Sequence, residues 1–379
     1  MRVVNPCAAK GVLMALWPDA WRFLQSGAMS RNRHDAAAFP SCRAALGSAE
    51  PEGQGRGTHM TITTAIIGLG IMGRRMLEHM LLHPAYAPAY LWDPNPENMA
   101  LAQAMAPGAV LADSAAAAMA GADLVYLACP PEPRRDYALA AAGMGKALFL
   151  EKPLGVDLEA SADLVARIAA SGVPAAVNFT QAAGAALTDV AADARSGRMG
   201  ALAGVDIVVT YAAWPRAWQK GADWLRFRDE GGMTREVISH FLFFSERVLG
   251  PLSLIWARPS YPADPALCET HLLARLETAE GLPVSVLASV GGAQPDRQEV
   301  TVKGALRSHR IADFYAVSTS DGGGFVRVTP EGIDPRATSL KAQLDDLEAM
   351  IAGRPHRLAT LEEALRVQRL IEAMLAGRG

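Results

Sequence analysis

The chain of 379 residues has few cysteines, no long apolar run and no run of basic residues. Four cysteines, Cys7, Cys42, Cys129 and Cys268, lie far apart without a CxxC pair, which argues for reduced thiols and against a disulfide framework or a zinc site. No apolar stretch approaches the roughly 20 residues that a membrane helix needs. The net charge of -3 offers no basic patch for nucleic acid. We therefore expect a cytoplasmic protein without nucleic-acid or membrane partners.

The composition is that of a globular protein, but the first 59 residues stand apart. Half of the residues are hydrophobic and 20% are charged, which suits packed cores. Residues 31–59 are rich in Arg, Ala, Ser and Gly and show neither helical nor strand periodicity. The apolar run at 11–17 ends at once in Pro18 and Asp19, which is unlike a secretory signal. We expect residues 1–59 to be a disordered or dispensable extension, with the folded protein beginning at Met60.

The first half of the remaining chain alternates short apolar strands with amphipathic helices. This alternation is typical of parallel βαβ units, and each strand is apolar enough to be buried on both faces. The strands are expected at Thr64–Ile67, Ala89–Trp92, Leu124–Cys129, Ala147–Leu150 and Ala175–Phe179. We predict a doubly wound parallel sheet of the Rossmann type over residues 60–180.

The second half, residues 181–379, has a different pattern, with several strands that follow one another with little helix between them. These strands are expected at Val205–Tyr211, Ser253–Arg258, His271–Thr278, Val284–Val290 and Val300–Lys303. A helix is expected at Arg235–Leu249, and two more at Leu340–Ile351 and Leu361–Leu375, the last with a capping box at Thr360 and Glu363. The fold class is therefore α/β plus α+β, with a mostly antiparallel, open second sheet closed by C-terminal helices.

A glycine-rich turn follows the first strand and opens a helix. In a GxGxxG turn, the first glycine makes the tight bend, the second admits a pyrophosphate and the third lets helix and strand approach closely. The phosphate charge lies at the N-terminus of the helix. The predicted cofactor-binding residues of this turn are Gly68, Gly70, Ile71, Met72 and Gly73. A strand on one side and a helix on the other favour dinucleotide binding over an ordinary turn.

Asp93 lies twenty residues after Gly73, at the end of the second predicted strand. A carboxylate at this distance binds the ribose hydroxyls of the adenosine in NAD, and it disfavours the phosphate that NADP carries there. The alternative is a turn residue in Asp93-Pro94-Asn95-Pro96. The spacing favours the cofactor role, so we expect NAD(P) as cofactor with NAD preferred.

Residues 129–155 resemble the Gfo/Idh/MocA family of oxidoreductases. The similarity extends over roughly residues 61–377, and its most specific element is Glu151-Lys152-Pro153 at the end of a strand, preceded by a proline pair that begins at Pro130. The resemblance implies that Pro130, Glu151 and Lys152 lie at the cofactor and that Lys152 also reaches the substrate. An ammonium there can bind the reacting oxygen or nitrogen. Arg134 replaces a histidine that many relatives have after the proline pair.

A second motif opens the helix expected at Arg235–Leu249. Relatives place an aspartate and a histidine four residues apart after a glycine pair, and here Glu236 and His240 match that spacing after Gly231-Gly232. Residues four apart share one face of a helix, so the carboxylate could orient the imidazole, which would then exchange the substrate proton. The resemblance implies that Lys152, Glu236 and His240 are catalytic and converge in one cleft.

The substrate contacts are less clearly marked. Asn178, near the end of the last strand of the parallel sheet, and Trp218, in a tryptophan-rich stretch, are candidates; the tryptophans could instead cover the edge of the sheet. His79 and His83 are four apart on the first helix, but two nitrogens without a third ligand make a weak site, and we expect no metal.

We thus predict an NAD(P)-dependent oxidoreductase that transfers a hydride between the nicotinamide and a small polar substrate. The resemblance implies a sugar, a cyclitol or a related alcohol or carbonyl, and a homo-oligomer that forms through the open face of the second sheet. Two alternatives remain: a non-catalytic protein of the same fold that senses a dinucleotide or a sugar, and an imine reductase. Retention of both Lys152 and His240 argues for an enzyme.

Overall fold

The computed structural model describes residues 61–378 except 220, 331 and 333. These described residues belong to one compact unit. The extension expected at residues 1–59 lies outside the described residues. Within the part of the chain that is described, no helix is both long enough and apolar enough to span a membrane.

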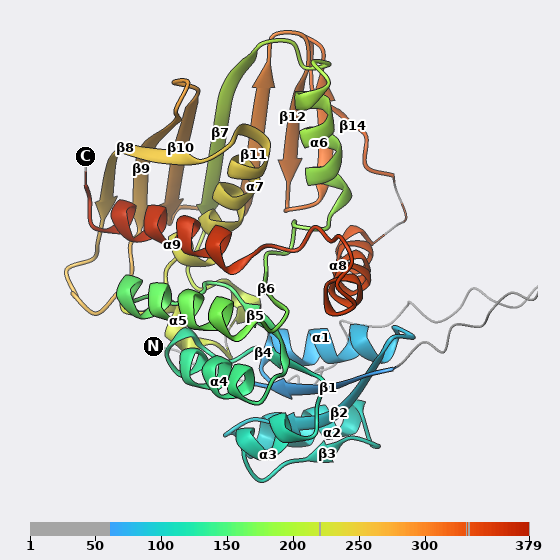
Figure 1. The fold of residues 1–379 in the computed structure, drawn as a ribbon. Coiled ribbons are helices and arrows are strands. Elements are labelled where there is room, and N and C mark those ends of the chain that lie inside the picture. Colours follow the sequence, from blue (N-terminus) through green and yellow to red (C-terminus); the bar gives the residue numbers. More distant parts are fainter. Residues whose placement is uncertain (1–60, 220, 331, 333, 379) are drawn as a thin grey trace, which may run out of the picture. The chain divides into compact units, whose positions relative to one another are not determined.

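Sheet A is a parallel sheet of six strands in the order β3-β2-β1-β4-β5-β6, the strand order of a dinucleotide-binding domain (Figure 1). Its strands are β1 (Ile62–Ile67), β2 (Tyr86–Trp92), β3 (Val110–Leu111), β4 (Leu124–Leu127), β5 (Ala147–Glu151) and β6 (Ala175–Asn178). The five strands expected from the sequence are all present, and the central strands β4 and β5 are buried throughout, as helices on both faces require. The exposed two-residue strand β3 was not predicted.

Five helices connect the strands of sheet A. They are α1 (Ile71–Leu81), α2 (Pro96–Met105), α3 (Ala115–Ala120), α4 (Pro131–Gly143) and α5 (Leu158–Ser171). Helix α1 begins inside the glycine turn, with Gly70 as its N-cap. Helix α5 is capped by Asp157 and ends at Gly172, which has a left-handed backbone with φ 71°.

Sheet B has eight strands in the order β14-β13-β12-β11-β7-β10-β9-β8. Its strands are β7 (Leu202–Tyr211), β8 (Leu252–Ser260), β9 (His271–Thr278), β10 (Pro283–Val290), β11 (Arg297–Gly304), β12 (Ser308–Ala312), β13 (Ala316–Ser320) and β14 (Val326–Arg327). All its pairs are antiparallel except β7 with β10, where Val205 lies opposite Val284. The mostly antiparallel second sheet is confirmed, whereas β12, β13 and β14 were not expected from the sequence.

Helices cover one face of sheet B and close the protein. Figure 1 shows α6 (Ala185–Arg195) and α7 (Ser239–Leu249) on this face, with α9 (Leu361–Leu375) between sheet B and α5. Helix α8 (Pro335–Ile351) packs against α1. The capping box of α9 forms as predicted, since Thr360 Oγ1 accepts from the Glu363 amide and the Glu363 carboxylate accepts from the Thr360 amide.

The helix expected at Arg235–Leu249 begins differently from the prediction. Residues Thr234–Ile238 form a single π-helical turn, and the α-helix α7 starts only at Ser239. Such turns interrupt the regular spacing of side chains along a helix and are frequent at functional sites. The turn carries Glu236 and leads directly into His240, so its geometry decides what these two side chains contact.

Candidate active site

A cavity of about 410 Å³ lies at the carboxyl ends of the strands of sheet A and is also lined by residues of sheet B's half of the chain. This is the place where open α/β sheets bind their ligands. Of the residues predicted for the site, all but Gly73 line this cavity: Gly68, Gly70, Ile71, Met72, Asp93, Pro130, Glu151, Lys152, Asn178, Trp218, Glu236 and His240. The convergence of Lys152 and His240, 88 positions apart in the sequence, is therefore a feature of the structure.

The glycine turn has the shape that a pyrophosphate needs. A Cβ on Gly68, which has φ +92°, would lie 2.6 Å from the Cys129 amide nitrogen, and one on Gly73 would lie 1.9 Å from the Gly68 carbonyl oxygen. Gly73 thus lets helix and strand approach, without facing the cavity. A Cβ on Gly70 would meet nothing within 4 Å, and the first turn of α1 holds no acidic residue. Open space beside helix amides fits a bound dinucleotide.

The buried carboxylate of Asp93 holds the glycine turn as well as lining the cavity. Its Oδ2 accepts a hydrogen bond of 2.6 Å from the Leu69 amide, and its Oδ1 accepts one of 2.8 Å from the Asn95 amide. A carboxylate oxygen has two lone pairs, so each oxygen keeps one for a further donor such as a ribose hydroxyl. The turn role and the cofactor role that the sequence offered as alternatives are therefore compatible.

Glu151, at the end of β5, is the centre of a buried polar cluster. Its Oε1 accepts a hydrogen bond of 2.7 Å from Asn178 Nδ2 and another from the Tyr126 hydroxyl. Burial raises the pKa of Glu151, while the bond from Tyr126 and the charge of Lys152 oppose that shift. The amide nitrogen of Asn178, expected to contact substrate, is thus bound to Glu151. Its Oδ1 has no hydrogen bond among the described residues.

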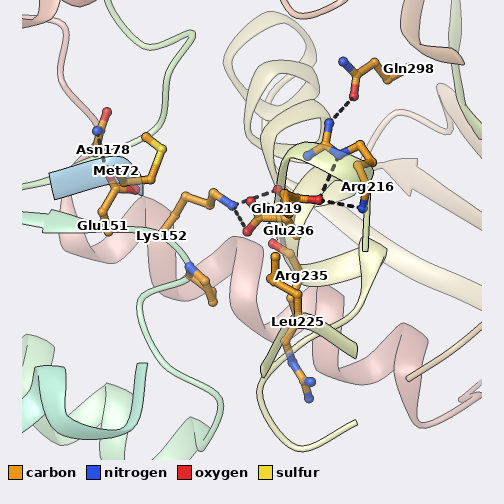
Figure 2. A network of polar contacts seen from close by, with 12 residues as sticks. Met72, Glu151, Lys152, Asn178, Arg216, Gln219, Leu225, Arg235, Glu236 and Gln298 are labelled. Atoms are coloured by element: carbon orange, nitrogen blue, oxygen red, sulfur yellow. Dashed lines mark hydrogen bonds and ion pairs between the residues drawn. The ribbon is translucent and has the colours of Figure 1, made fainter. Parts of the chain in front are cut away.

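Lys152 joins the two halves of the site. Its Nζ donates a hydrogen bond of 2.8 Å to the Glu236 carbonyl oxygen and forms an ion pair with the Glu236 carboxylate, as Figure 2 shows. The side chains are 7% and 21% exposed. The sequence led us to expect that Glu236 would orient His240. The carboxylate contacts Lys152 instead, because the π-helical turn presents it to the end of β5.

His240 is buried between two phenyl rings. Its imidazole lies edge-on to Phe179, with ring centres 5.7 Å apart, and to Phe314 at 5.2 Å. Burial lowers its pKa well below the ordinary value, and the positive charges of Lys152 and Arg216 lower it further. Its Nδ1 has no hydrogen bond among the described residues. The imidazole is therefore neutral near pH 7 and able to accept a proton.

Arg134 has a structural task that its sequence position did not reveal. The side chain is 2% exposed; its Nη2 donates a bond of 2.5 Å to the Cys129 carbonyl, and its Nη1 donates to the carbonyls of Glu151, at 2.7 Å, and Pro153. One guanidinium thereby ties the end of β4 to both sides of Lys152. In the sequence, Arg134 stood out only as a departure from relatives. Its hydrogen bonds to main-chain carbonyls could not be predicted from the sequence.

Three further arginines line the cavity and were not predicted from the sequence: Arg75, Arg216 and Arg336. Of the tryptophan-rich stretch, Trp218 and Trp224 line the cavity, with Trp218 49% exposed. Trp214 instead packs on Tyr211 and donates to the Leu225 carbonyl at 2.9 Å. The position of Arg216 among these tryptophans could have indicated that it lines the site. Arg336 lies far away in the sequence, where no such indication exists.

Two other residues, His83 and Cys129, were considered for a metal site or for reactivity. His83 Nε2 lies 2.9 Å from Asp345 Oδ1, and no group of three or more His, Cys, Asp or Glu residues that could hold a metal occurs among the described residues. Cys129 is buried, and burial raises the pKa of its thiol although Arg134 opposes the shift. A buried thiol with a raised pKa is a poor nucleophile.

Comparison with known proteins agrees with this geometry. Residues 62–179 match the model of the Gfo/Idh/MocA oxidoreductase family, NAD-binding Rossmann fold. No curated protein matches the chain in sequence.

Solved structures share the fold at low sequence identity. GenD2 from gentamicin A biosynthesis, in complex with NAD, is 18% identical with a TM-score of 0.71, over 84% of this chain and 95% of its own. The WlbA dehydrogenase from Bordetella pertussis, in complex with NADH and UDP-GlcNAcA, is 20% identical with a TM-score of 0.71, over 83% and 94%. The scyllo-inositol dehydrogenase from Lactobacillus casei is 18% identical with a TM-score of 0.69, over 84% and 97%. The match to the Gfo/Idh/MocA family model thus covers the Rossmann domain, and the solved structures share the fold over most of the chain.

Proposed function

We propose that the protein is an NAD-dependent dehydrogenase or reductase that interconverts an alcohol and a carbonyl on a small polyhydroxy substrate, such as a sugar, a cyclitol or a sugar derivative. One observation carries this proposal: Lys152, Glu236 and His240 line the same cavity as the glycine turn. The substrate class is supported by similar structures that hold UDP-GlcNAcA or scyllo-inositol.

The residues that would hold the cofactor are those of the turn and of the strand ends around it. Gly68, Gly70, Ile71 and Met72 leave room for the pyrophosphate, and Asp93 would accept the ribose hydroxyls and repel the phosphate of NADP. Pro130 and Glu151 lie on the same wall of the cavity. When bound, NAD supplies the nicotinamide ring that accepts or returns a hydride at C4.

The protein's own part in the reaction is to move one proton and to stabilise charge on oxygen. In the oxidative direction, the neutral imidazole of His240 accepts the proton of the substrate hydroxyl. The ammonium of Lys152 donates a hydrogen bond to the same oxygen and stabilises the charge that develops there. Glu236 holds Lys152 in place and compensates its charge between turnovers. In the reductive direction, the imidazolium returns the proton.

The assembly proposed for this enzyme is a homo-oligomer that forms through the open face of sheet B. Apolar side chains on β8, β9 and β10 are exposed on this face: Ile255, Trp256, Leu273 and Leu287. Exposed apolar patches of this kind mark protein–protein contacts. A cytoplasmic location stays a prediction. The domain bounds at residues 60–180 and 181–379 also stay predictions from the sequence.

Turnover with a panel of substrates tests the proposed function. We expect NADH formation from NAD with at least one member of a panel of sugars, cyclitols, sugar acids and nucleotide sugars, and its loss in Lys152→Met. Fluorescence of bound NADH without turnover of any alcohol, carbonyl or imine would contradict the proposal and favour a sensor of the same fold. Turnover of imines alone would favour an imine reductase.

A further inference from the structure

The cavity holds more positive than negative charge at its substrate end. We propose that the substrate carries an anionic group, a carboxylate or a phosphate, and that Arg216, Arg75 and Arg336 bind this group. The inference deepens the proposed function and rests on it. It depends on three observations. Arg216 is buried among neutral groups, Arg75 and Arg336 line the same cavity, and every carboxylate in the cavity is already bound by another group of the protein.

Arg216 is a nearly buried cation with neutral partners. It is 9% exposed; its Nε donates a bond of 3.0 Å to Gln219 Oε1, and its Nη1 donates one of 3.1 Å to Gln298 Oε1 (Figure 2). Its guanidinium carbon lies 5.1 Å from the centre of the Tyr211 ring and 4.8 Å from that of Trp218. Amide oxygens and aromatic faces fix the position of a guanidinium, but a buried charge is costly until an opposite charge meets it.

Arg75 and Arg336 place further positive charge on the wall of the same cavity. Arg75 lies on α1, and its guanidinium carbon is 6.0 Å from the centre of the Trp218 ring. Arg216 comes from a different element, the loop after β7. Arg336, at the start of α8, is exposed, lies 5.9 Å from the Tyr315 ring and lines the cavity. Burial lowers the pKa of Arg75, and the charge of Arg336 lowers it further. Two cations that repel each other across a cavity favour an anion between them.

The carboxylates of the cavity are already committed. Glu236 pairs with Lys152, Asp93 accepts from two amides of the glycine turn region, and Glu151 accepts from Tyr126 and Asn178. Among the described residues, none of the three arginines has a carboxylate within the 4.0 Å of an ion pair. For the buried guanidinium of Arg216, the compensating charge is therefore left to a ligand.

The position of Arg216 favours the substrate over the cofactor as the source of this charge. Its charge acts on the pKa of His240, so it lies at the reacting end of the cavity. The pyrophosphate of NAD belongs at Gly68–Met72, where helix amides already receive it. A guanidinium binds the two oxygens of a carboxylate or phosphate in a fork, which a neutral hydroxyl cannot match.

Binding to the NADH-loaded protein tests the inference without turnover. Titration calorimetry would compare D-glucuronate and D-glucose 6-phosphate with neutral D-glucose, and the first two distinguish a carboxylate site from a phosphate site. We expect at least one anion to bind about tenfold to a hundredfold more tightly than glucose, the range for a hydrogen bond between charged groups. Arg216→Gln and Arg336→Gln should each remove most of this preference. Because Arg336 is exposed, its substitution leaves the fold intact.

The matched control is Arg369→Gln, the same change at an exposed position of α9 that does not line the cavity. It should keep the preference for the anion. Equal binding of glucose and both anions by the wild type would overturn the inference, and so would an unchanged preference in both arginine variants. Weaker NADH binding in these variants with an unchanged preference would assign the arginines to the cofactor. Turnover of neutral sugars alongside equal binding would leave the proposed function standing, so the two failures are distinguishable.

Discussion

Lys152 Nζ donates a hydrogen bond of 2.8 Å to the main-chain carbonyl of Glu236 and forms an ion pair with the carboxylate of the same residue. Lys152 directly follows β5 of the parallel sheet, whereas Glu236 lies on the π-helical turn before α7. One ammonium thus connects the two halves of the cavity. Two contacts with Glu236 hold this ammonium, so the lysine is in position before any substrate binds.

Removing the ammonium should abolish most of the turnover. Lys152→Met takes away the donor to the reacting oxygen, and loss of one such donor lowers kcat by about 10²–10³-fold. NADH affinity should stay close to that of the wild type, because the glycine turn is untouched. Steady-state kinetics and NADH fluorescence measure the two effects. Lys146→Met, at a half-buried lysine just before the opposite end of β5, should change neither. Near-normal kcat in Lys152→Met would remove Lys152 from the mechanism.

The pH dependence should show a histidine that titrates below the ordinary value of about 6.5. Burial first, then Lys152 and Arg216, lower the pKa of His240, so the neutral, proton-accepting form persists into mild acid. The acid limb of kcat/KM for alcohol oxidation should therefore fall below pH 6.5. Arg216→Gln removes one positive charge and should raise this pKa. NMR titration of histidine Cε1 protons, with His240→Gln to assign the signal, measures it without a substrate. A His240 pKa at or above the ordinary value would contradict the prediction.

The same shift affects stability with a definite sign. The unfolded chain protonates His240 near pH 6.5, whereas the folded protein does so only at lower pH. The unfolded state then binds more protons, so the contribution of His240 to stability is full above the unfolded pKa and is lost as the pH falls below it.

Arg134 should matter for stability and for the position of Lys152. Its substitution leaves three buried carbonyls, those of Cys129, Glu151 and Pro153, without their donor. Each unsatisfied buried group costs about 1–3 kcal/mol, so Arg134→Met should lower the free energy of unfolding by several kcal/mol. Arg134→Lys should restore part of it, and kcat should recover together with stability. Urea unfolding measures the loss.

The neighbouring Arg135 provides the control for Arg134. Its side chain is partly exposed and pairs with Asp163 and Asp136 on the surface. Surface ion pairs contribute about 0–1 kcal/mol, so Arg135→Met should have a small effect on unfolding. Equal losses in the two variants would show that the carbonyl contacts of Arg134 are not what stabilises this region.

Asp93 should determine cofactor choice. Asp93→Asn removes the charge and replaces one acceptor oxygen, which weakens the contact with the Leu69 amide and the expected contact with ribose. NADH should bind about tenfold less tightly, the effect of losing one charge-assisted hydrogen bond, and the ratio of NADPH to NADH affinity should rise. Fluorescence titration with both cofactors checks this, with exposed Asp113→Asn as control. A wild type that prefers NADPH would refute the role assigned to Asp93.

The first 59 residues should be dispensable. A protein that starts at Met60 retains every residue that the structure describes, including all those that line the cavity. We expect its kcat and its NADH affinity to match those of the full chain. Loss of folding or activity in the shortened protein, followed by circular dichroism and turnover, would show that the extension belongs to the enzyme.

Five of the six strands of sheet A, all but β3, could be predicted because each is a short apolar run, and burial on both faces demands such runs. The last strands of sheet B could not. All five residues of β13 are half-buried, and β14 has two exposed residues, so neither shows the alternation that a half-buried strand needs. β13 forms because β12 offers it an edge to pair with, and β14 pairs with β13 in turn, which are tertiary conditions.

The sequence predicted most of the residues that line the site, but not the contacts that they make. The glycine turn, Lys152 and His240 belong to motifs with fixed spacing, and they line the cavity as expected. The partner of Glu236 was not predictable, because helical spacing assumes a regular helix and the π-helical turn departs from it. Arg336 reaches the cavity from α8, and no local pattern announces a contact made by the packing of distant elements.

The place of β7 in sheet B has a consequence for how this enzyme can diverge. β7 lies inside the sheet, held by β11 on one side and β10 on the other, and the chain passes directly from Tyr211 into the loop that carries Arg216 and Trp218. The loop therefore leaves from a strand that is paired on both sides, while the residues proposed for hydride transfer lie on other elements. Exchange of residues 212–231 between relatives offers a way to change what the enzyme accepts without rebuilding how it reacts.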